Sequence, residues 1–380
     1  MIRFITCMLT SALLMPAVLP AEEALFEEKD IYISGLDGYN TFRIPACVVT
    51  NDGTVLAFCE GRRASTSDSG DIDLVLKRSL DGGSVWQPMQ VVWDDEENTC
   101  GNPCPVVDRE TGMIWLLMTH NLGSDHESEI WDRTGQGTRT VWVTSSSDDG
   151  LTWSPPRDIT VSVKEQEWTW YATGPGIGIQ LRSGRLLVPC DHGVAVTKDY
   201  HSHVIYSDDH GVSWNVGGTV PNPATSESQV VELADGRVMI NIRNHPVKTG
   251  YRTVSTSKDG GLTWSGTRLD SALVDPACQG SVLRYTLEQE YGKNRILYSG
   301  PSDDKSRIRM TVYLSTDDGG TWLVSRLLHE GPSSYSCLTV LPDMTIACMY
   351  EGGERHRREK IAFARFNLEW LTNGADTLKP

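Results

Sequence analysis

Hydrophobic residues occur along this chain in short runs, about four to eight positions long, that turn-forming residues separate. Apolar and polar side chains alternate over residues 310–314, and residues 75–76 belong to a similar run. Helical periodicity is scarce, and the one helix that we predict is a short piece at 367–371, after a strand at 361–366. The pattern therefore predicts an all-β protein whose neighbouring strands are joined by tight turns.

Five copies of the pattern Ser-x-Asp-x-Gly-x-x-Trp lie between these strands, at residues 79–86, 146–153, 207–214, 257–264 and 315–322. Their mean spacing of about 59 residues is the size of a repeat that makes one four-stranded sheet. Residues 22–380 hold about six repeats of that size. We therefore expect one domain, a six-bladed β-propeller of four-stranded antiparallel blades. The blade without the pattern should be the one that the two chain ends close together.

Each copy of the pattern has a structural explanation that needs no ligand. Ser and Asp side chains bond to backbone amides in tight turns, and Gly supplies the positive φ that such turns require. The Trp that ends each copy is expected to pack beside the hairpin and to direct its indole N–H at a carbonyl group. Sugar binding by these Trp residues is the alternative, but the same aromatic residue in the same turn five times favours packing.

Residues 1–21 are predicted to be a secretory signal peptide. Residues 4–19 are mostly apolar, Arg3 precedes them, and Ala21 or Ala24 provides a small residue for cleavage. The stretch is too short and too interrupted by Pro for a stable membrane span, and no second long apolar run follows. We expect an exported protein, in the periplasm, at the cell surface or in the medium, without stable membrane insertion.

Eight cysteines follow the predicted leader, and two explanations for them are open. An even number in an exported chain permits disulfides, but most of these cysteines lie in apolar segments such as 46–48 and 347–349, which favours buried free thiols. Cys100 and Cys104 lack a second pair with zinc spacing, so we predict no metal and no cofactor.

The net charge is −16 at pH 7, and the longest basic run is residues 355–360, which argues against a nucleic-acid partner. An acidic protein can still bind an anion where a few arginines converge. The candidates outside the repeats are Arg43 with residues 60–63 and Asp68; residues 226–229 with Arg243; residues 307–309; and Tyr335 with Glu351.

Residues 42–45, Phe-Arg-Ile-Pro, resemble the signature of the exo-α-sialidases, or neuraminidases, of the bacterial and animal type. The five repeats resemble the Asp boxes of that family, and residues 278–281 and 331–336 extend the resemblance over essentially the whole chain beyond the leader. Asp boxes alone occur in other propellers and receptors, whereas boxes, signature and tyrosine segment in this order are specific. The resemblance implies a glycoside hydrolase that removes terminal sialic acid from glycoproteins, oligosaccharides or gangliosides.

The resemblance also implies roles for substrate-binding residues. The residues that match the three arginines around the substrate carboxylate are Arg43, Arg243 and Arg307. A guanidinium group pairs with a carboxylate through two parallel hydrogen bonds, which lysines cannot form. Glu351 is implied to hold Arg43 in place. Arg63 is implied to touch the sugar ring, and Arg62 of the same doublet remains the alternative.

Tyr335, Glu227 and Asp68 match the catalytic residues of the family. Sialic acid carries a carboxylate on its anomeric carbon, so an ionised Asp or Glu nucleophile would meet like charge. A neutral Tyr335 that loses its proton to Glu227 avoids this repulsion, and sialidases are a known exception to the rule of two catalytic carboxylates. Asp68 is implied to protonate the leaving group and later to activate water, with net retention of configuration.

Other assignments stay open. Asn121, Asp125 and residues 168–176 lie where the family builds walls for the N-acetyl and glycerol groups, but Asp125 is equally well explained as a loop residue. Trp170 and Tyr171 either shape the aglycone side or simply pack.

The main alternative to hydrolysis is transfer of sialic acid, to another sugar or within the substrate, because both reactions use the same tyrosyl intermediate. The alternative from another class is a propeller that binds sialic acid without catalysis. Such a protein is expected to lack Tyr335, Glu227 or Asp68, and all three are present.

Overall fold

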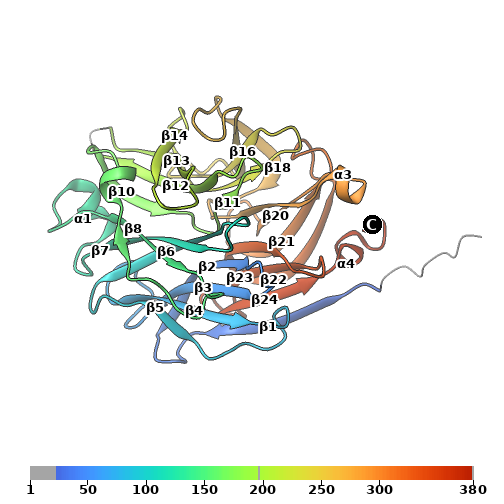
Figure 1. Ribbon diagram of the computed structural model, residues 1–380, viewed down its shortest axis with the longest axis horizontal. Helices are drawn as coiled ribbons and strands as arrows, with labels where there is room; N and C mark the ends of the chain where they lie inside the picture. The colour runs from blue at the N-terminus through green and yellow to red at the C-terminus, as the bar shows by residue number, and fades with distance from the viewer. Residues whose placement is uncertain (1–22, 196, 379–380) are drawn as a thin grey trace, which may run out of the picture.

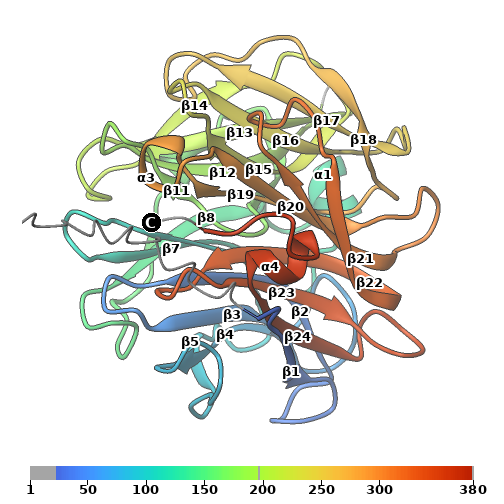
Figure 2. The ribbon, with the colours of Figure 1, turned by 90° about the vertical axis from the view of Figure 1, so that its right-hand side faces the viewer.

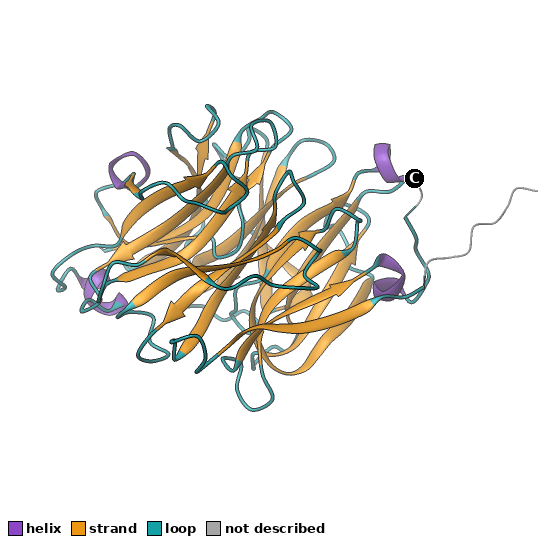
Figure 3. Cartoon of the chain, turned by 60° about the horizontal axis from the view of Figure 1, so that its bottom comes forward, coloured by secondary structure: helices purple, strands orange, loops and turns teal. Residues whose placement is uncertain are grey.

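The computed structural model describes residues 23–195 and 197–378, and this part of the chain consists mainly of β-strands (Figures 1 and 3). Its helices are all short: α1 (Glu127–Asp132), α2 (Thr160–Val163), α3 (Glu288–Tyr291) and α4 (Leu368–Thr372). The predicted helix after the last strand is confirmed as α4, whose N-cap Asn367 accepts a hydrogen bond from the backbone N–H of Trp370 at 2.9 Å. Within the described ranges, no helix has the length and apolar character needed to cross a membrane. The predicted signal peptide lies outside the described residues.

The strands pair with their neighbours in chain order, in sets of four. The first set is β2 (Thr41–Val49), β3 (Val55–Arg62), β4 (Ile72–Ser79) and β5 (Gln90–Trp93). The second set is β6 (Thr99–Val107), β7 (Ile114–Asn121), β8 (Thr140–Ser146) and β9 (Arg157–Asp158). Pairing within each set is antiparallel, and one parallel bridge, between Ile72 and Thr99, joins the two sets.

The next two sets are separate sheets. One contains β10 (Trp168–Thr173), β12 (Leu186–Val194), β13 (Asp199–Ser207) and β14 (Asn215–Thr219), with β11 (Ile179–Gln180) paired to β12. The other contains β15 (Thr225–Glu232), β16 (Val238–Asn244), β17 (Tyr251–Ser257) and β18 (Arg268–Val274). Both are antiparallel, as tight turns between successive strands require.

The last sheet contains both ends of the described chain. Its strands are, in order, β19 (Ser281–Thr286), β20 (Arg295–Pro301), β21 (Ile308–Ser315), β22 (Val324–Val340), β23 (Ile346–Gly352), β24 (Lys360–Phe366) and β1 (Phe26–Ile33). The long strand β22 pairs with β21 through its first part and with β23 through its second part, so it belongs to two sets. Figure 2 shows β1 and β24, from opposite ends of the chain, side by side. Between these two strands no turn can carry the repeated pattern, which explains five copies for six sets.

Apolar side chains are buried between neighbouring sheets. One cluster joins Val106 of β6 to Val188 of β12, and another joins Val204 of β13 to Ile240 of β16. Each such side chain stabilises the fold by about 1.5–3 kcal/mol when it is fully buried. The largest cluster contains residues of β2 to β4 and of β22 to β24, so the last sheet packs against the first.

The repeated pattern forms the turn between the third and fourth strands of five sets. In the first copy, Ser79 Oγ donates to Asp81 Oδ1 and accepts from the N–H of Gly83, both at 2.8 Å, and the N–H of Val85 donates to Asp81 Oδ1 at 2.8 Å. The same three bonds recur in the second copy, at 2.8, 2.9 and 2.9 Å. Gly83 has a φ of 91°, and a Cβ there would lie 2.3 Å from the ring of Phe363. The structural explanation of the repeats is therefore confirmed.

The Trp residues of the repeats pack against the preceding sheet. Trp86 contacts Phe363 of β24 edge-on at 5.2 Å between ring centroids, and Trp153 contacts Phe58 of β3 in the same way at 5.6 Å. This packing fixes the orientation of each ring. The direction of the indole N–H is therefore set by the packing and not by the position of the nearest carbonyl.

The prediction that each indole N–H meets a carbonyl is right for one Trp only. Trp264 Nε1 donates to the carbonyl of Gly218 at 2.9 Å, whereas Trp322 Nε1 donates to the carboxylate of Asp270 at 3.0 Å. The repeat indoles whose buried N–H has no hydrogen-bond partner among the described residues are Trp86, Trp153 and Trp214.

All eight cysteines in the described part of the chain are buried and free, so the disulfide alternative is wrong. Cys47 and Cys337 illustrate their environment, because the backbone N–H of Cys47 donates to Cys337 Sγ at 3.2 Å between β2 and β22. These thiols act as small apolar side chains within the sheets.

Candidate active site

One open cavity receives side chains from the first strands of five sets, β2, β6, β10, β15 and β22, and from the strands next to them. Its volume is about 820 Å³ with the open mouth included. Charged side chains dominate its lining: Arg43, Arg62, Arg139, Arg243, Arg307 and Arg358 with Glu60, Asp68, Glu127, Asp191 and Glu227. Such a lining suits a polar ligand that carries an anionic group.

Tyr335 and Glu227 meet in this cavity. Tyr335 Oη donates to Glu227 Oε1 at 2.5 Å. Tyr335 lies in β22 where its pairing with β23 is irregular, between Ser333 and Ser336. The side chain is only 6% exposed and packs with Ile44 and Cys278, so the phenol is held towards the carboxylate.

The electrostatics of this pair assign a protonation state to each member. Burial, followed by the negative charge of Glu227, raises the pKa of Tyr335 well above its ordinary value, although three arginines act in the opposite direction. Burial also acts to raise the pKa of Glu227, but the charge of Arg243 and the hydrogen bond from Tyr335 bring it below its ordinary value. The pair is therefore a neutral phenol beside a carboxylate that can accept its proton, the arrangement of a nucleophile with its base.

Arg43 is oriented by Glu351 of β23. The Nε and Nη2 atoms of Arg43 donate to the two carboxylate oxygens at 3.1 and 3.4 Å, and the N–H of Ile44 donates to Oε1 at 3.0 Å. Ile44 has a φ of 60°, which is rare for a β-branched residue, and the pairing of β2 with β3 is irregular after Arg43. Glu351 thus binds both the guanidinium group and the strained backbone that aims Arg43 into the cavity.

The arginines predicted to act together do converge. Arg243, on β16, directs Nη1 at Glu227 Oε2 at 2.5 Å and at Tyr335 Oη at 3.0 Å. The guanidinium carbons of Arg43 and Arg307 lie 5.0 and 5.6 Å from the centre of the Tyr335 ring. Three guanidinium groups thus surround one phenol, and groups of this kind pair with carboxylates through parallel hydrogen bonds.

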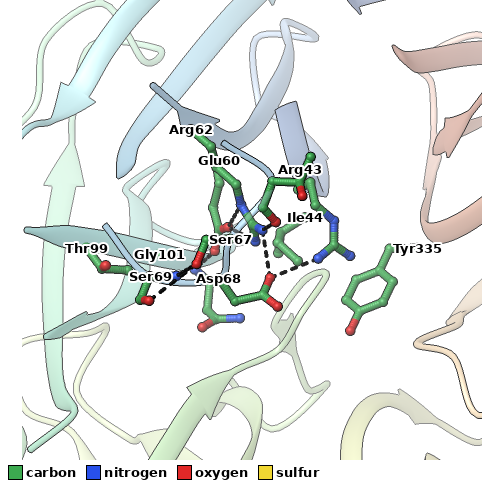
Figure 4. A network of polar contacts seen from close by, with 12 residues as sticks. Arg43, Ile44, Glu60, Arg62, Ser67, Asp68, Ser69, Thr99, Gly101 and Tyr335 are labelled. Carbon is green, nitrogen blue, oxygen red and sulfur yellow. Dashed lines mark hydrogen bonds and ion pairs between the residues drawn. The ribbon is translucent and has the colours of Figure 1, made fainter. Parts of the chain in front are cut away.

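Asp68 lies in the loop between β3 and β4, and its side chain is 61% exposed. Its Oδ1 is 2.7 Å from Nη1 of Arg62 and 3.0 Å from Nη1 of Arg43 (Figure 4). Although partial desolvation by the surrounding protein acts to raise the pKa of Asp68, the positive charges of Arg62, Arg43 and Arg358 lower it to about 2. Asp68 is thus an ionised carboxylate that forms ion pairs with two arginines of the cavity.

Arg62, and not Arg63, lies in the cavity, which corrects the sequence prediction. Successive side chains at a strand end point in opposite directions, so only one member of the doublet can face Asp68. Arg63 instead pairs with Asp71 and Asp73, at 3.2 and 2.7 Å. Asp71 is the last residue of the loop and Asp73 lies in β4, and together they hold Arg63 outside the cavity.

Asp125 does not line the cavity, so of its two explanations the loop role is the one that the contacts support. It is buried, and its Oδ2 accepts from the N–H of Gly137 at 2.7 Å. Asn121 donates Nδ2 to the backbone carbonyl of Asp125 at 3.1 Å and accepts from Arg139 Nη1 at 2.7 Å. Asn121 thus contacts the cavity residue Arg139, and Asp125 is linked to that arginine through Asn121.

Trp170 and Tyr171 point to opposite sides of β10. Trp170 lines the cavity beneath the guanidinium group of Arg139, whose carbon is 4.2 Å from the ring centroid. Tyr171 is fully buried, and its hydroxyl lies 3.0 Å from Nε2 of His203. Trp170 thus shapes the cavity, whereas Tyr171 packs behind it.

Four charged residues of the cavity belong to no motif: Arg139, Asp191, Glu127 and Arg358. Arg139 is buried and donates Nη2 to Asn102 Oδ1 at 2.5 Å. Asp191 on β12 is also buried; burial, followed by the charge of Glu227, raises its pKa well above the ordinary value. Glu127 accepts a hydrogen bond from Tyr200. Asp191 could have been recognised as a candidate from the sequence, because it is an acidic residue within an otherwise mainly apolar strand.

Comparisons with known proteins identify the family to which the chain is similar. Residues 53–348 match the family described as BNR repeat-like domain. The chain is 35% identical to a sialidase of Micromonospora viridifaciens over 93% of its own length, but it spans only 55% of that relative. It is 32% identical to an exo-alpha-sialidase of Arthroderma benhamiae and 34% identical to one of Aspergillus fumigatus, in each case over 89% of this chain and 86% of the relative.

Solved structures show the same fold. The Hadza microbial sialidase Hz136 superposes with a TM-score of 0.83 at 31% identity, over 90% of this chain and 69% of that one. The intramolecular trans-sialidase of Ruminococcus gnavus has a TM-score of 0.76 at 21% identity, over 92% of this chain and 98% of that one. Together with the family match and the relatives, these results show that the chain belongs to the exo-α-sialidase family of glycoside hydrolases.

Proposed function

We propose that this chain is an exported exo-α-sialidase that hydrolyses terminal sialic acid with retention, through a tyrosyl-enzyme intermediate. The observation that carries the proposal is the 2.5 Å hydrogen bond from Tyr335 to Glu227, with Arg43, Arg243 and Arg307 around the phenol. Its substrates are sialylated glycans, which we propose to be those of glycoproteins, oligosaccharides and gangliosides.

In the first step, the three arginines bind the substrate carboxylate and place the anomeric carbon next to Tyr335 Oη. The phenol attacks this carbon while its proton moves to Glu227 Oε1, the oxygen to which it is already hydrogen-bonded. The bond from the anomeric carbon to the leaving oxygen breaks, and that oxygen takes a proton from Asp68. The products of this step are an aryl glycoside, in which the anomeric carbon is bonded to Tyr335 Oη, and the free aglycone.

In the second step, water attacks the same carbon from the side that the aglycone has left. Asp68, now ionised, accepts the proton of this water, and the bond to Tyr335 breaks as the phenoxide regains its proton from Glu227. Two inversions at one carbon give net retention. Each catalytic group returns to its initial protonation state, so the cycle is complete.

Product analysis tests hydrolysis against transfer. Proton NMR on 3′- and 6′-sialyllactose should show the α-anomer of free sialic acid first, followed by its slow conversion to the β-anomer. An anhydro sugar as the first product would favour intramolecular transfer, and the β-anomer first would contradict the tyrosyl intermediate.

We further propose that residues 22–380 form one six-bladed propeller and that residues 1–21 direct its export. Six sets of four strands and the packing of the last sheet on the first support the closed propeller. The apolar segment that follows Arg3 in the sequence supports export. Expression of the full chain in a host with a secretory pathway, followed by N-terminal sequencing of the exported protein, tests the leader; a retained Met1 would contradict it.

A further inference from the structure

A second, shallower cleft adjoins the cavity and shares Asp68, Glu127 and Tyr200 with it. Its other walls come from the Asp68 loop, from α1 and from the segment before β13. If Asp68 protonates the leaving oxygen, as proposed above, the leaving group must lie on the Asp68 side of the sialic acid ring, and this is the side on which the cleft opens.

An aromatic side chain, Trp131 of α1, forms one wall of the cleft. Its ring packs on that of Tyr200 with 4.3 Å between centroids and 32° between planes. Gly193 of β12 makes room for it, because a Cβ there would lie 1.8 Å from Trp131 Cζ3. A half-buried indole that other residues hold in place is a rigid surface for a flat apolar face.

Polar contacts tie this wall to the loop that carries the acid. Ser69 Oγ lies 2.7 Å from Nδ1 of His126, which precedes α1. Lys198 forms an ion pair with Asp132 at the other end of α1, so its charge is already matched. The cleft therefore offers hydroxyl and imidazole groups beside an aromatic ring, and since Lys198 is the one lysine or arginine among its described lining residues, it has no unpaired cation for a second anion.

We propose that this cleft binds the neutral hexose to which sialic acid is attached. Sugar rings have an apolar face of C–H groups and an edge of hydroxyl groups; the first would pack on Trp131 and the second would bond to His126 and Ser69. The inference rests on the proposed function, because it takes Asp68 as the proton donor. It makes Trp131 and His126 determinants of leaving-group specificity.

Two substrates that differ only in the hexose test the proposal. Methyl α-sialoside has a leaving group of similar basicity to that of 3′-sialyllactose, but it has no sugar to fill the cleft. In Trp131→Ala and in His126→Gln, kcat/KM for 3′-sialyllactose should fall by about tenfold, while kcat/KM for the methyl sialoside stays within about twofold of wild type. His210→Gln, on the third repeat, is the matched control and should change neither value.

The other outcomes distinguish failure of the hexose site from failure of the proposed function. Equal losses on both substrates in Trp131→Ala and His126→Gln, or a wild type that cleaves both substrates equally well, would overturn the hexose site. A wild-type preference for an α2,8-linked disialoside over 3′-sialyllactose would also contradict it, because that leaving group is an anion. A wild type that cleaves none of the three would contradict the proposed function itself.

Discussion

Asp68 forms an ion pair with Arg43, one of the three arginines that we propose bind the substrate carboxylate, with 3.0 Å between Oδ1 and Nη1. In the free enzyme the carboxylate of Asp68 therefore competes with the substrate for the same cation. Substrate binding should displace Asp68 from Arg43 and remove one of the three positive charges, those of Arg62, Arg43 and Arg358, that lower its pKa to about 2. The substrate would thereby convert an ionised aspartate into a proton donor.

Ligand binding should accordingly be linked to proton uptake. Because the pKa of Asp68 rises from about 2 in the free enzyme, the complex binds more protons than its separate parts at a pH near the ordinary carboxyl range, about pH 4. Calorimetry with an unreactive sialic acid analogue, in buffers of different ionisation heat, measures this number. Uptake should vanish in Asp68→Asn, and uptake that is unchanged in this variant would assign the proton to another group.

Asp68→Ala should discriminate between leaving groups. An acidic phenol leaves without a proton, whereas the hydroxyl of a sugar needs one, so cleavage of sialyllactose should fall far more than cleavage of an activated aryl sialoside. Pre-steady-state release of the aglycone isolates the first step from the later activation of water. If both substrates lose equally in that step, Asp68 is not the acid, and Asp71 in the same loop is the next carboxylate to test.

Replacement of Arg243 or Arg307 by Lys keeps the charge but loses the two-pronged geometry. We expect kcat/KM to fall by an amount equivalent to about 2 to 4 kcal/mol in the transition state. Steady-state kinetics on one sialoside measures the loss, and Arg365→Lys, whose guanidinium pairs with Asp343 outside the cavity, is the matched control. An unchanged kcat/KM in either cavity variant would remove that arginine from the site.

Arg63→Ala should destabilise the fold in a pH-dependent way. Burial raises the pKa of Asp73, and Arg63, 2.7 Å away, opposes this shift. Without Arg63 the folded-state pKa rises further above the unfolded value, so the folded protein loses more stability as the pH rises through that pKa. Denaturant unfolding should show a larger loss relative to wild type at neutral pH than in acid. A loss that is the same at both would mean that Arg63 contributes only by packing.

The sequence was most informative where a motif is repeated or where the residues of a motif are contiguous. The Ser-x-Asp-x-Gly-x-x-Trp turns depend on bonds within eight residues, so their structure and number of repeats follow from local pattern alone. Arg43 and Tyr335 lie in contiguous signatures, and the structure brings them together with Glu227 as the resemblance implies.

Features that depend on strand direction or on long-range packing could not be predicted from the sequence. Arg62 and Arg63 are chemically identical neighbours, and only the orientation of the strand end decides which one faces Asp68. Arg139 and Asp191 lie singly on different sheets, so no local spacing links them. The indole N–H groups were mispredicted for a similar reason, because the neighbouring sheet fixes each Trp ring.

The central claim is that Tyr335 is the nucleophile, and trapping of the covalent intermediate tests this claim most directly. A 2,3-difluorosialic acid should react with the enzyme, because the fluoride at C2 leaves easily, while the fluorine at C3 slows release of the sugar from the enzyme. Peptide mapping by mass spectrometry should then find the sugar on Tyr335 and find none in Tyr335→Phe, whose ring still packs with Ile44 and Cys278. A sugar attached to Glu227 or Asp68, or a Phe variant that keeps more than about a tenth of wild-type kcat on sialyllactose, would contradict the tyrosyl mechanism.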